Sequence, residues 1–198
     1  MKILIIEDER IVAQNVTDLL TQEGFEVAGV ADSYDSGLKL FLATEPELVL
    51  CDVRIKGTLT GVDLMKHLKK SYDFKIIYVT AYGDEALLAE THATNPEAFV
   101  IKPYTEKQLL MSIRFSMGNA RYAQSNPRND PKLSAYEELS LREKQILALV
   151  GKGKSSKEIS EELFISPLTV ETHRKNILKK MEFESTVQLI VFVITNRL

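Results

Sequence analysis

Short apolar runs alternate with amphipathic stretches through the first 120 residues of the chain. The runs, rich in β-branched residues, predict five strands at residues 2–6, 25–30, 47–53, 75–80 and 98–101. Apolar residues at helical spacing predict helices over residues 10–20, 36–42, 62–68, 84–92 and 105–117. This alternation is typical of a parallel sheet with helices on both faces. The pattern therefore predicts an α/β fold with a flavodoxin-like, doubly wound sheet of five parallel strands.

The composition changes between residues 119 and 133. This segment holds two prolines and three asparagines and almost no large apolar residue. Such a composition is typical of a linker, although an irregular surface loop inside one domain would look similar. We assign residues 1–120 to a first domain, 121–137 to a linker and 138–198 to a second, smaller domain.

The pattern of the second domain is helical throughout. Four helix starts are marked by the capping-box pairs Ser140–Glu143, Ser155–Glu158 and Ser185–Gln188, and by Ser166 followed by Pro167. A tight turn over residues 163–166 separates the second helix from the third. The pattern therefore predicts an all-α, four-helix domain that contains a helix-turn-helix.

The composition excludes several classes of protein. Of 198 residues, 44% are hydrophobic and 27% are charged, as in ordinary globular proteins. The longest apolar run, residues 189–194, is far too short to span a membrane, and the N-terminus lacks the apolar core of a signal peptide. A single cysteine, Cys51, excludes an internal disulfide framework and a multi-cysteine zinc site, and we expect it to be a buried structural thiol. We expect a soluble, cytoplasmic protein with no membrane partner.

The charge is distributed unevenly between the two halves. Residues 1–121 carry 13 basic and 18 acidic residues, whereas residues 138–198 carry 10 and 8. Arg174, Lys175, Lys179 and Lys180 fall within seven positions. This asymmetry predicts different partners for the two halves, with the basic cluster facing nucleic acid.

Polar side chains gather where the predicted strands end. These residues are Glu7 and Asp8, Asp52, Thr80 and Lys102. Because the carboxyl ends of parallel strands meet at one edge, three carboxylates would share a crevice with a hydroxyl and an ammonium group. Clustered carboxylates call for a hard cation, and Mg²⁺ fits best. A carboxylate beside Mg²⁺ and Lys102 could attack a phosphoryl group and form an acyl phosphate. Taken alone, Glu7 or Asp8 could instead cap the following helix.

The tripeptides EDE at 7–9, CDV at 51–53, VTA at 79–81 and IKP at 101–103 together resemble the receiver domain of two-component response regulators. The resemblance covers residues 1 to about 120. It implies that Asp52 is the phosphoacceptor, that Asp8 ligates Mg²⁺ directly, that Glu7 assists through water, and that the backbone carbonyl of Arg54 is a further ligand. It also implies that Thr80 is the switch hydroxyl, Phe99 the coupled aromatic residue and Lys102 the phosphate-pairing lysine. The loop over residues 55–61 departs from the family pattern, since it lacks the usual proline and is one residue longer.

The predicted third helix of the second domain, residues 167–181, has two distinct faces. Its apolar face carries Val170, Ile177, Leu178 and Met181, and another face carries Leu168, Glu171, Thr172, Lys175 and Lys179. The second face could simply be solvated. The helix follows a tight turn and also carries Arg174 and Lys180, and both features favour a DNA recognition helix.

The segments LSLREKQILALV and SKEISEELFISPLTVETHRKNILKKM resemble the LuxR-type (NarL/FixJ) helix-turn-helix over residues 138–198. The resemblance implies structural roles for Glu143 and Ile159. It implies base reading by Glu171, Thr172 and Lys175, and DNA-backbone contacts by Ser166, Thr169, His173 and Arg174; Lys179 is a further expected phosphate contact. Many members carry Lys where this chain has Glu171, so the operator expected here differs.

The two resemblances together predict a phosphorylation-dependent, DNA-binding transcription regulator. Its expected partners are a histidine kinase, double-stranded promoter DNA, RNA polymerase and, after phosphorylation, a second copy of the chain. We expect no enzymatic activity beyond self-phosphotransfer and autodephosphorylation at Asp52.

Two other functions stay open at this point. One is a phosphatase of the haloacid-dehalogenase type, which needs a D-x-D directly after the first strand, where this chain has Glu7-Asp8-Glu9. The other is an RNA-binding antiterminator, which would lack the four capped helices. A gel-shift comparison of binding to duplex DNA and to structured RNA distinguishes an antiterminator from a DNA-binding regulator.

Overall fold

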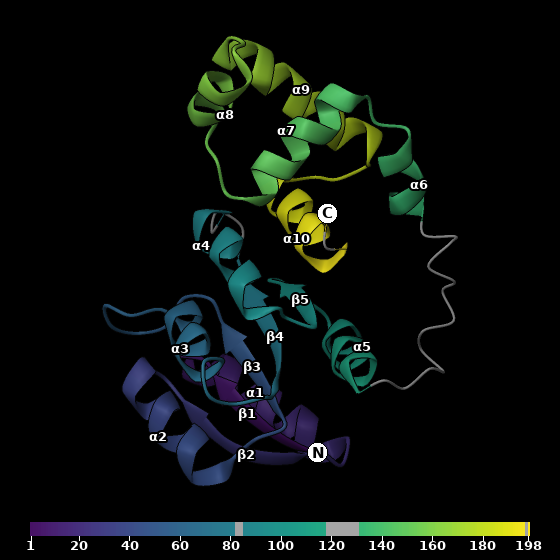
Figure 1. Ribbon diagram of the computed structural model, residues 1–198. Coiled ribbons are helices and arrows are strands. Elements are labelled where there is room, and N and C mark those ends of the chain that lie inside the picture. The colour runs from purple at the N-terminus through teal and green to yellow at the C-terminus, as the bar shows by residue number, and fades with distance from the viewer. Residues whose placement is uncertain (82–84, 118–130, 197) are drawn as a thin grey trace. The chain divides into compact units, whose positions relative to one another are not determined.

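A computed structural model describes residues 1–81, 85–117, 131–196 and 198 of the chain (Figure 1). Its contacts divide the chain into two compact units. One comprises Met1–Ala81 and Thr91–Gly118, and the other comprises Tyr82–Glu90 and Asn119–Leu198. Each unit is described by itself. Among the described residues, no helix combines the length and the apolar character needed to cross a bilayer.

The first unit is built on a five-stranded sheet. The strands are β1 (Lys2–Ile6), β2 (Glu26–Ala31), β3 (Leu48–Asp52), β4 (Lys75–Thr80) and β5 (Ala98–Ile101). All pair in parallel, in the order β2-β1-β3-β4-β5. The central strand β3 is buried along its whole length, as expected for a strand covered on both faces. The predicted fold class of this unit, a doubly wound parallel sheet, is confirmed.

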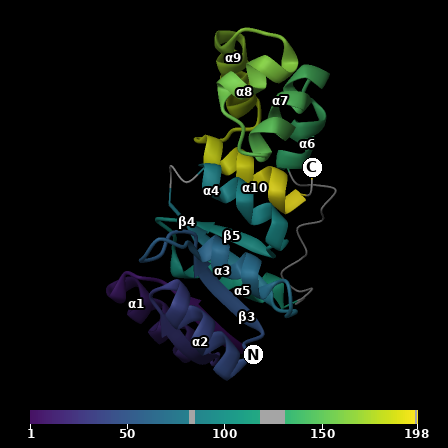
Figure 2. The same cartoon turned by 60° about the vertical axis from the view of Figure 1, so that its left-hand side comes forward.

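Helices cover both faces of this sheet (Figures 1 and 2). The helices of this unit are α1 (Arg10–Gln22), α2 (Tyr34–Thr44), α3 (Gly61–Leu68), the 3₁₀ helix η1 (Thr91–Thr94) and α5 (Glu106–Ser116). On one face, Val16 and Leu20 of α1 and Leu109 and Ile113 of α5 form one apolar core with the strands. Apolar side chains of α2 and α3 pack on the other face. This burial on both faces holds the strand ends in fixed positions.

Gly61 allows α3 to begin next to the end of β3. A Cβ atom at position 61 would lie 2.0 Å from the backbone oxygen of Asp52 and 2.7 Å from Sγ of Cys51. Only glycine permits so close an approach. Cys51 is fully buried, as expected, and burial raises the pKa of its thiol well above the ordinary value.

The helix boundaries differ from the sequence predictions by a few residues. Ser33 caps α2, which therefore starts at Tyr34, two residues before the predicted start. The helix predicted over 84–92 is split into α4 (Glu85–Glu90) and η1, within which the Thr94 hydroxyl donates to the Thr91 carbonyl at 2.7 Å. Such side-chain hydrogen bonds to the backbone compete with α-helical pairing.

In the second unit, the described residues from 131 onwards form the four predicted helices and one additional helix. The four are α7 (Leu141–Gly151), α8 (Ser156–Leu163), α9 (Pro167–Lys180) and α10 (Thr186–Asn196), and α8, Phe164 to Ser166 and α9 form the helix-turn-helix. The predicted all-helical second domain is confirmed. Its core includes Ile146, Ile159, Val170, Ile177 and Ile190, each at most 1% exposed.

An additional helix, α6 (Pro131–Glu137), lies inside the range predicted as linker. The Lys132 ammonium group donates to the carbonyl oxygens of Met181 and Glu182, at 2.5 and 2.9 Å, just beyond the end of α9. The ring of Tyr136 packs against Phe192 of α10, with 6.1 Å between centroids. These contacts fix α6 to the helix-turn-helix core.

A buried carboxylate ties the start of α7 to the end of α9. Glu143 is 4% exposed and caps α7 by accepting from the backbone N–H and the hydroxyl of Ser140, at 2.9 and 2.7 Å. The Lys180 ammonium group donates to the same carboxylate at 2.8 Å. Burial raises the pKa of Glu143, but the bonds from Lys180 and Ser140 outweigh it and lower the pKa from 4.5 to about 2.

We expect the helical unit to lose stability as the pH falls from about 4.5 towards about 2. A carboxyl group whose pKa is lowered by folding stabilises the folded state above its unfolded pKa, and this contribution disappears as the pH falls through the folded pKa. Glu143→Gln should therefore be about 2 kcal/mol less stable than the parent at pH 7, with a difference that shrinks towards pH 2. The measurement is urea unfolding of the full chain at several pH values, followed through NMR signals of α7. Glu161→Gln, at an exposed position of α8, is the control. A difference for Glu143→Gln that is independent of pH would contradict this assignment.

Candidate functional site

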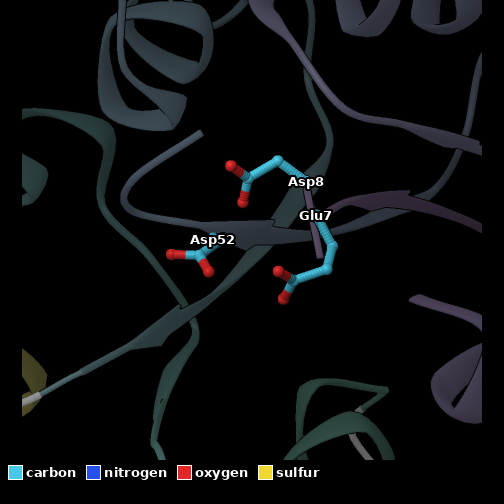
Figure 3. A group of neighbouring side chains, drawn as sticks. All are labelled: Glu7, Asp8 and Asp52. Carbon is cyan, nitrogen blue, oxygen red and sulfur yellow. The ribbon is translucent and has the colours of Figure 1, made fainter. Parts of the chain in front are cut away.

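The strand ends bring the predicted chemical groups to one edge of the sheet. Glu7 and Asp8 follow β1, Asp52 ends β3, Thr80 ends β4 and Lys102 follows β5. Figure 3 shows the carboxyl groups of Glu7, Asp8 and Asp52 gathered beside one another. One oxygen of each lies within 4.8 Å of the others. The cluster expected from the strand ends is therefore present.

These carboxylates repel each other. At such a separation two unit charges cost about 3 kcal/mol at an effective dielectric constant of about 20. Glu7 and Asp52 are 5% and 8% exposed, so water screens them poorly, whereas Asp8 is exposed. The site can hold this charge only with positive charge nearby.

Lys102 supplies part of that positive charge. Its ammonium group donates to Asp52 Oδ2 at 2.6 Å and to Glu7 Oε2 at 2.8 Å. Glu9 lies further away, with Oε1 at 3.9 Å from the ammonium nitrogen. The sequence pattern does not predict the Glu7–Lys102 pair, because the family resemblance implies only a phosphate-pairing role for Lys102.

The pKa shifts follow from this arrangement. Burial raises the pKa of Glu7, as does the charge of Asp52, while the Lys102 hydrogen bond lowers it only in part. Burial likewise raises the pKa of Asp52, and Lys102 opposes the shift. Burial alone would lower the pKa of Lys102, but hydrogen bonds to the two carboxylates raise it above the ordinary lysine value. A further positive charge would favour the ionised form of both carboxylates.

Backbone and side-chain groups around Asp52 complete the site. The Arg54 backbone N–H donates to Asp52 Oδ1 at 3.0 Å and orients the carboxylate. Thr80 is fully buried, and its hydroxyl donates to the Ala81 carbonyl at 3.3 Å. Phe99 is half-buried and stacks on Tyr78 with 5.8 Å between ring centroids. A groove of about 780 Å³ opens beside Lys102 between α1 and α5.

The predicted DNA-contacting residues lie on or next to α9. The Ser166 hydroxyl caps the helix by accepting from the Thr169 N–H at 3.0 Å, and Thr172 donates to the Leu168 carbonyl at 2.9 Å. Exposed side chains at the start and along one side of the helix are those of Ser166, Thr169, Glu171, Thr172, Lys175 and Lys179. Lys180 is held by Glu143 within the unit.

His173 and Arg174 are half-buried rather than exposed. Nδ1 of His173 is buried and has no hydrogen-bond partner in the described part of the chain. Arg174 donates to the hydroxyls of Ser156, at 3.1 Å, and Thr186, at 3.3 Å. Ser156 also hydrogen-bonds the carboxylate of Glu171. Sequence reasoning missed Ser156, because it stands 15 residues before Glu171 in another helix.

Comparison with protein families assigns both units. Residues 3–114, more than half of the chain, match the response regulator receiver domain. Residues 137–193 match the bacterial regulatory proteins of the luxR family. The chain belongs to the two-component response regulators. This response regulator combines a receiver with a LuxR-type helix-turn-helix, so both family resemblances are confirmed.

Relatives of this response regulator match it over nearly their whole length. It is 29% identical over 205 residues to the "Uncharacterized transcriptional regulatory protein YhcZ" of Bacillus subtilis (strain 168), covering 98% of this chain and 95% of the relative. It is 27% identical over 215 residues to the transcriptional regulatory protein LiaR of the same strain, covering 100% and 99%. Among solved structures, full-length FixJ from B. japonicum is 28% identical with a TM-score of 0.50, covering 100% of this chain and 98% of FixJ.

The three clustered carboxylates of this response regulator are consistent with a Mg²⁺ site.

We expect millimolar Mg²⁺ to raise the temperature of the calorimetric unfolding transition of the receiver, because a ligand that binds only the folded state stabilises it. At a Mg²⁺ concentration of ten times the Kd, the free energy of unfolding rises by about 1.4 kcal/mol. Asp8→Asn should abolish the shift. Asp73→Asn, which changes an exposed acid after α3, is the control and should keep it. Equal shifts in all three proteins would indicate a general salt effect and refute the site.

Proposed function

We propose that this response regulator is a phosphorylation-dependent transcription regulator of a two-component system. In this proposal Asp52 accepts a phosphoryl group from a histidine kinase, and the helix-turn-helix binds promoter DNA. The observation that carries the proposal is the contact of Asp52 with Lys102, at 2.6 Å, within a cluster of three carboxylates. The groove between α1 and α5, which reaches Lys102, would offer a protein donor a surface next to the site.

The proposed phosphotransfer uses the residues at the strand ends. An oxygen of the Asp52 carboxylate attacks the phosphorus atom, and the bond from phosphorus to the imidazole nitrogen of the kinase histidine breaks. The product is an acyl phosphate on Asp52. Lys102 already lies against this carboxylate and would pair with a phosphoryl oxygen, offsetting the charge that develops on it.

The donor set of this site suits Mg²⁺. Glu7, Asp8 and Asp52 offer carboxylate oxygens, and the backbone carbonyl of Arg54 would add a further ligand. Bound there, Mg²⁺ would supply positive charge to the carboxylates and to the incoming phosphoryl group. Glu7 also accepts from Lys102, which supports a role for it through water rather than direct contact.

The switch in this proposal involves Thr80 and Phe99. The Thr80 hydroxyl would turn from the Ala81 carbonyl towards the phosphoryl group, since a charged acceptor forms the stronger hydrogen bond. Phe99, stacked on Tyr78 of the neighbouring strand, would move with it.

The output of the proposed switch is DNA binding by α9. Glu171, Thr172 and Lys175 would read base edges, while Ser166, Thr169, His173, Arg174 and Lys179 would contact the DNA backbone. The exposed basic side chains of Lys175 and Lys179 support this division. A phosphorylation-induced homodimer would place two recognition helices about one DNA turn apart, with RNA polymerase as a further partner. Because the two main proposed partners are a histidine kinase and promoter DNA, we place the protein in the cytoplasm. We propose no catalysis beyond its own phosphotransfer and dephosphorylation.

We expect Asp52→Asn to abolish covalent labelling by acetyl phosphate or phosphoramidate in the presence of Mg²⁺, because an amide lacks the nucleophilic carboxylate oxygen. Phosphate-affinity electrophoresis and intact mass measure the labelling. The control Asp73→Asn should be labelled like the parent. If Asp52→Asn is labelled as fully as the parent, another residue is the phosphoacceptor.

We expect Lys175→Ala and Lys179→Ala to weaken DNA binding in different ways. Loss of a phosphate contact at Lys179 should weaken binding to all sequences alike and reduce the slope of log K against log salt by about 1. Loss of a base contact at Lys175 should cost about 1–3 kcal/mol mainly at the specific site. Fluorescence anisotropy on specific duplex, random duplex and structured RNA gives both quantities. Equal losses on specific and random duplex for Lys175→Ala would rule out base reading, and preference for RNA would favour an antiterminator.

A further inference from the structure

Glu171 is a fixed negative charge on an otherwise basic helix. It is the only acidic residue of α9, which also carries Arg174, Lys175, Lys179 and Lys180. Its side chain is exposed, yet its carboxylate is not left to move freely, because Oε1 is hydrogen-bonded to the hydroxyl of Ser156 in α8. The negatively charged phosphates of DNA repel this carboxylate, so Glu171 cannot serve as a phosphate contact of α9.

A chain of hydrogen bonds fixes the position of the Glu171 carboxylate. Arg174 Nη1 donates to the Ser156 hydroxyl at 3.1 Å, and Ser156 in turn bonds Glu171. A second guanidinium nitrogen of Arg174 donates to Thr186 of α10 at 3.3 Å. Ser156 is the first residue of α8, directly after the N-cap Ser155, so its position is set by the capping box of that helix. Groups from three helices therefore fix where the carboxylate lies.

The chemistry of base edges restricts what such a carboxylate can bind. An ionised carboxylate only accepts hydrogen bonds. In the major groove, guanine presents two acceptors, thymine an acceptor and a methyl group, and adenine a donor beside an acceptor. Cytosine presents its N4 amino donor without a neighbouring acceptor. A carboxylate held in place accordingly favours cytosine and disfavours guanine and thymine.

We propose that Glu171 selects cytosine in the major groove and that Ser156 and Arg174 act as positioning residues for its carboxylate. The inference rests on the proposed function, in which α9 is the DNA recognition helix. Ordering the flexible Glu171 side chain before binding reduces the entropy lost when the base contact forms. Ser156 thus contributes to base selection from a helix that precedes the recognition helix.

The test is a selection from randomised duplex DNA, performed with the full chain treated with phosphoramidate and Mg²⁺. The proteins are the parent, Glu171→Gln, Ser156→Ala and Ser156→Thr, with Glu161→Gln as a matched loss of one exposed acid from α8. For each enriched motif, anisotropy on duplexes that differ at one base pair gives the Kd ratio for cytosine against the other bases. Calorimetric transitions report whether a variant merely destabilises the unit.

We expect the parent and Glu161→Gln to enrich a motif with one cytosine per half-site that Glu171 requires. Glu171→Gln should lose that preference by about 5- to 100-fold and gain adenine at the same position, since an amide pairs with both N6 and N7 of adenine. Ser156→Ala should reduce the cytosine preference several-fold, and Ser156→Thr, which restores the hydroxyl, should recover it.

The possible failures are distinguishable. If the parent enriches no duplex sequence, the proposed function falls and the inference falls with it. If the parent enriches a motif and Glu171→Gln enriches the same motif, cytosine selection is overturned while the proposed function stands. If Ser156→Ala lowers the calorimetric transition but keeps the parental base preference, Ser156 only packs α8 against α9 and its positioning role is overturned.

Discussion

The mutual repulsion of three carboxylates at one edge of a parallel sheet is the constraint on which the receiver depends. Glu7, Asp8 and Asp52 are held within 4.8 Å of one another by strands that are buried on both faces, so the backbone cannot relax to separate them. Lys102 offsets part of this charge through two hydrogen bonds. Burial raises the pKa of Glu7 and Asp52, and Lys102 opposes these shifts only in part. The site therefore suits a divalent cation.

Two carboxylates of the helical unit, those of Glu143 and Glu171, also have defined hydrogen-bond donors. Glu143 is satisfied by Ser140 and Lys180, and it joins the start of α7 to the end of α9. Glu171 is held by Ser156, at the start of α8. Glu143 thus fixes the C-terminal end of α9, and Glu171 is exposed on the surface of α9. This contrast supports a structural role for Glu143 and a binding role for Glu171.

Much of this arrangement was predictable because it depends on periodicity. Alternating apolar runs predicted the five strands, and the position of Asp52 or Lys102 at a strand end then predicted the shared edge. Contacts between residues far apart in the chain produce no periodic pattern in the sequence. Two examples are the hydrogen bond from Lys132 of α6 to the end of α9 and the hydrogen bond between Ser156 and Glu171. The polar composition of residues 131–137 therefore predicts a linker where the structure has α6, because composition does not reveal the contacts of Lys132 and Tyr136 that hold this helix. The DNA-contacting residues, the domain boundaries and the phosphoacceptor stay predictions.

We propose that phosphorylation at Asp52 controls DNA binding by α9. The most direct measurement is the affinity of the full chain for a selected duplex, before and after treatment with phosphoramidate and Mg²⁺, in the parent and in Asp52→Asn. The account predicts that treatment tightens binding of the parent at least tenfold, about 1.4 kcal/mol, and leaves Asp52→Asn unchanged. Equal affinity of the treated and untreated parent, with Asp52 fully phosphorylated by mass, would contradict it.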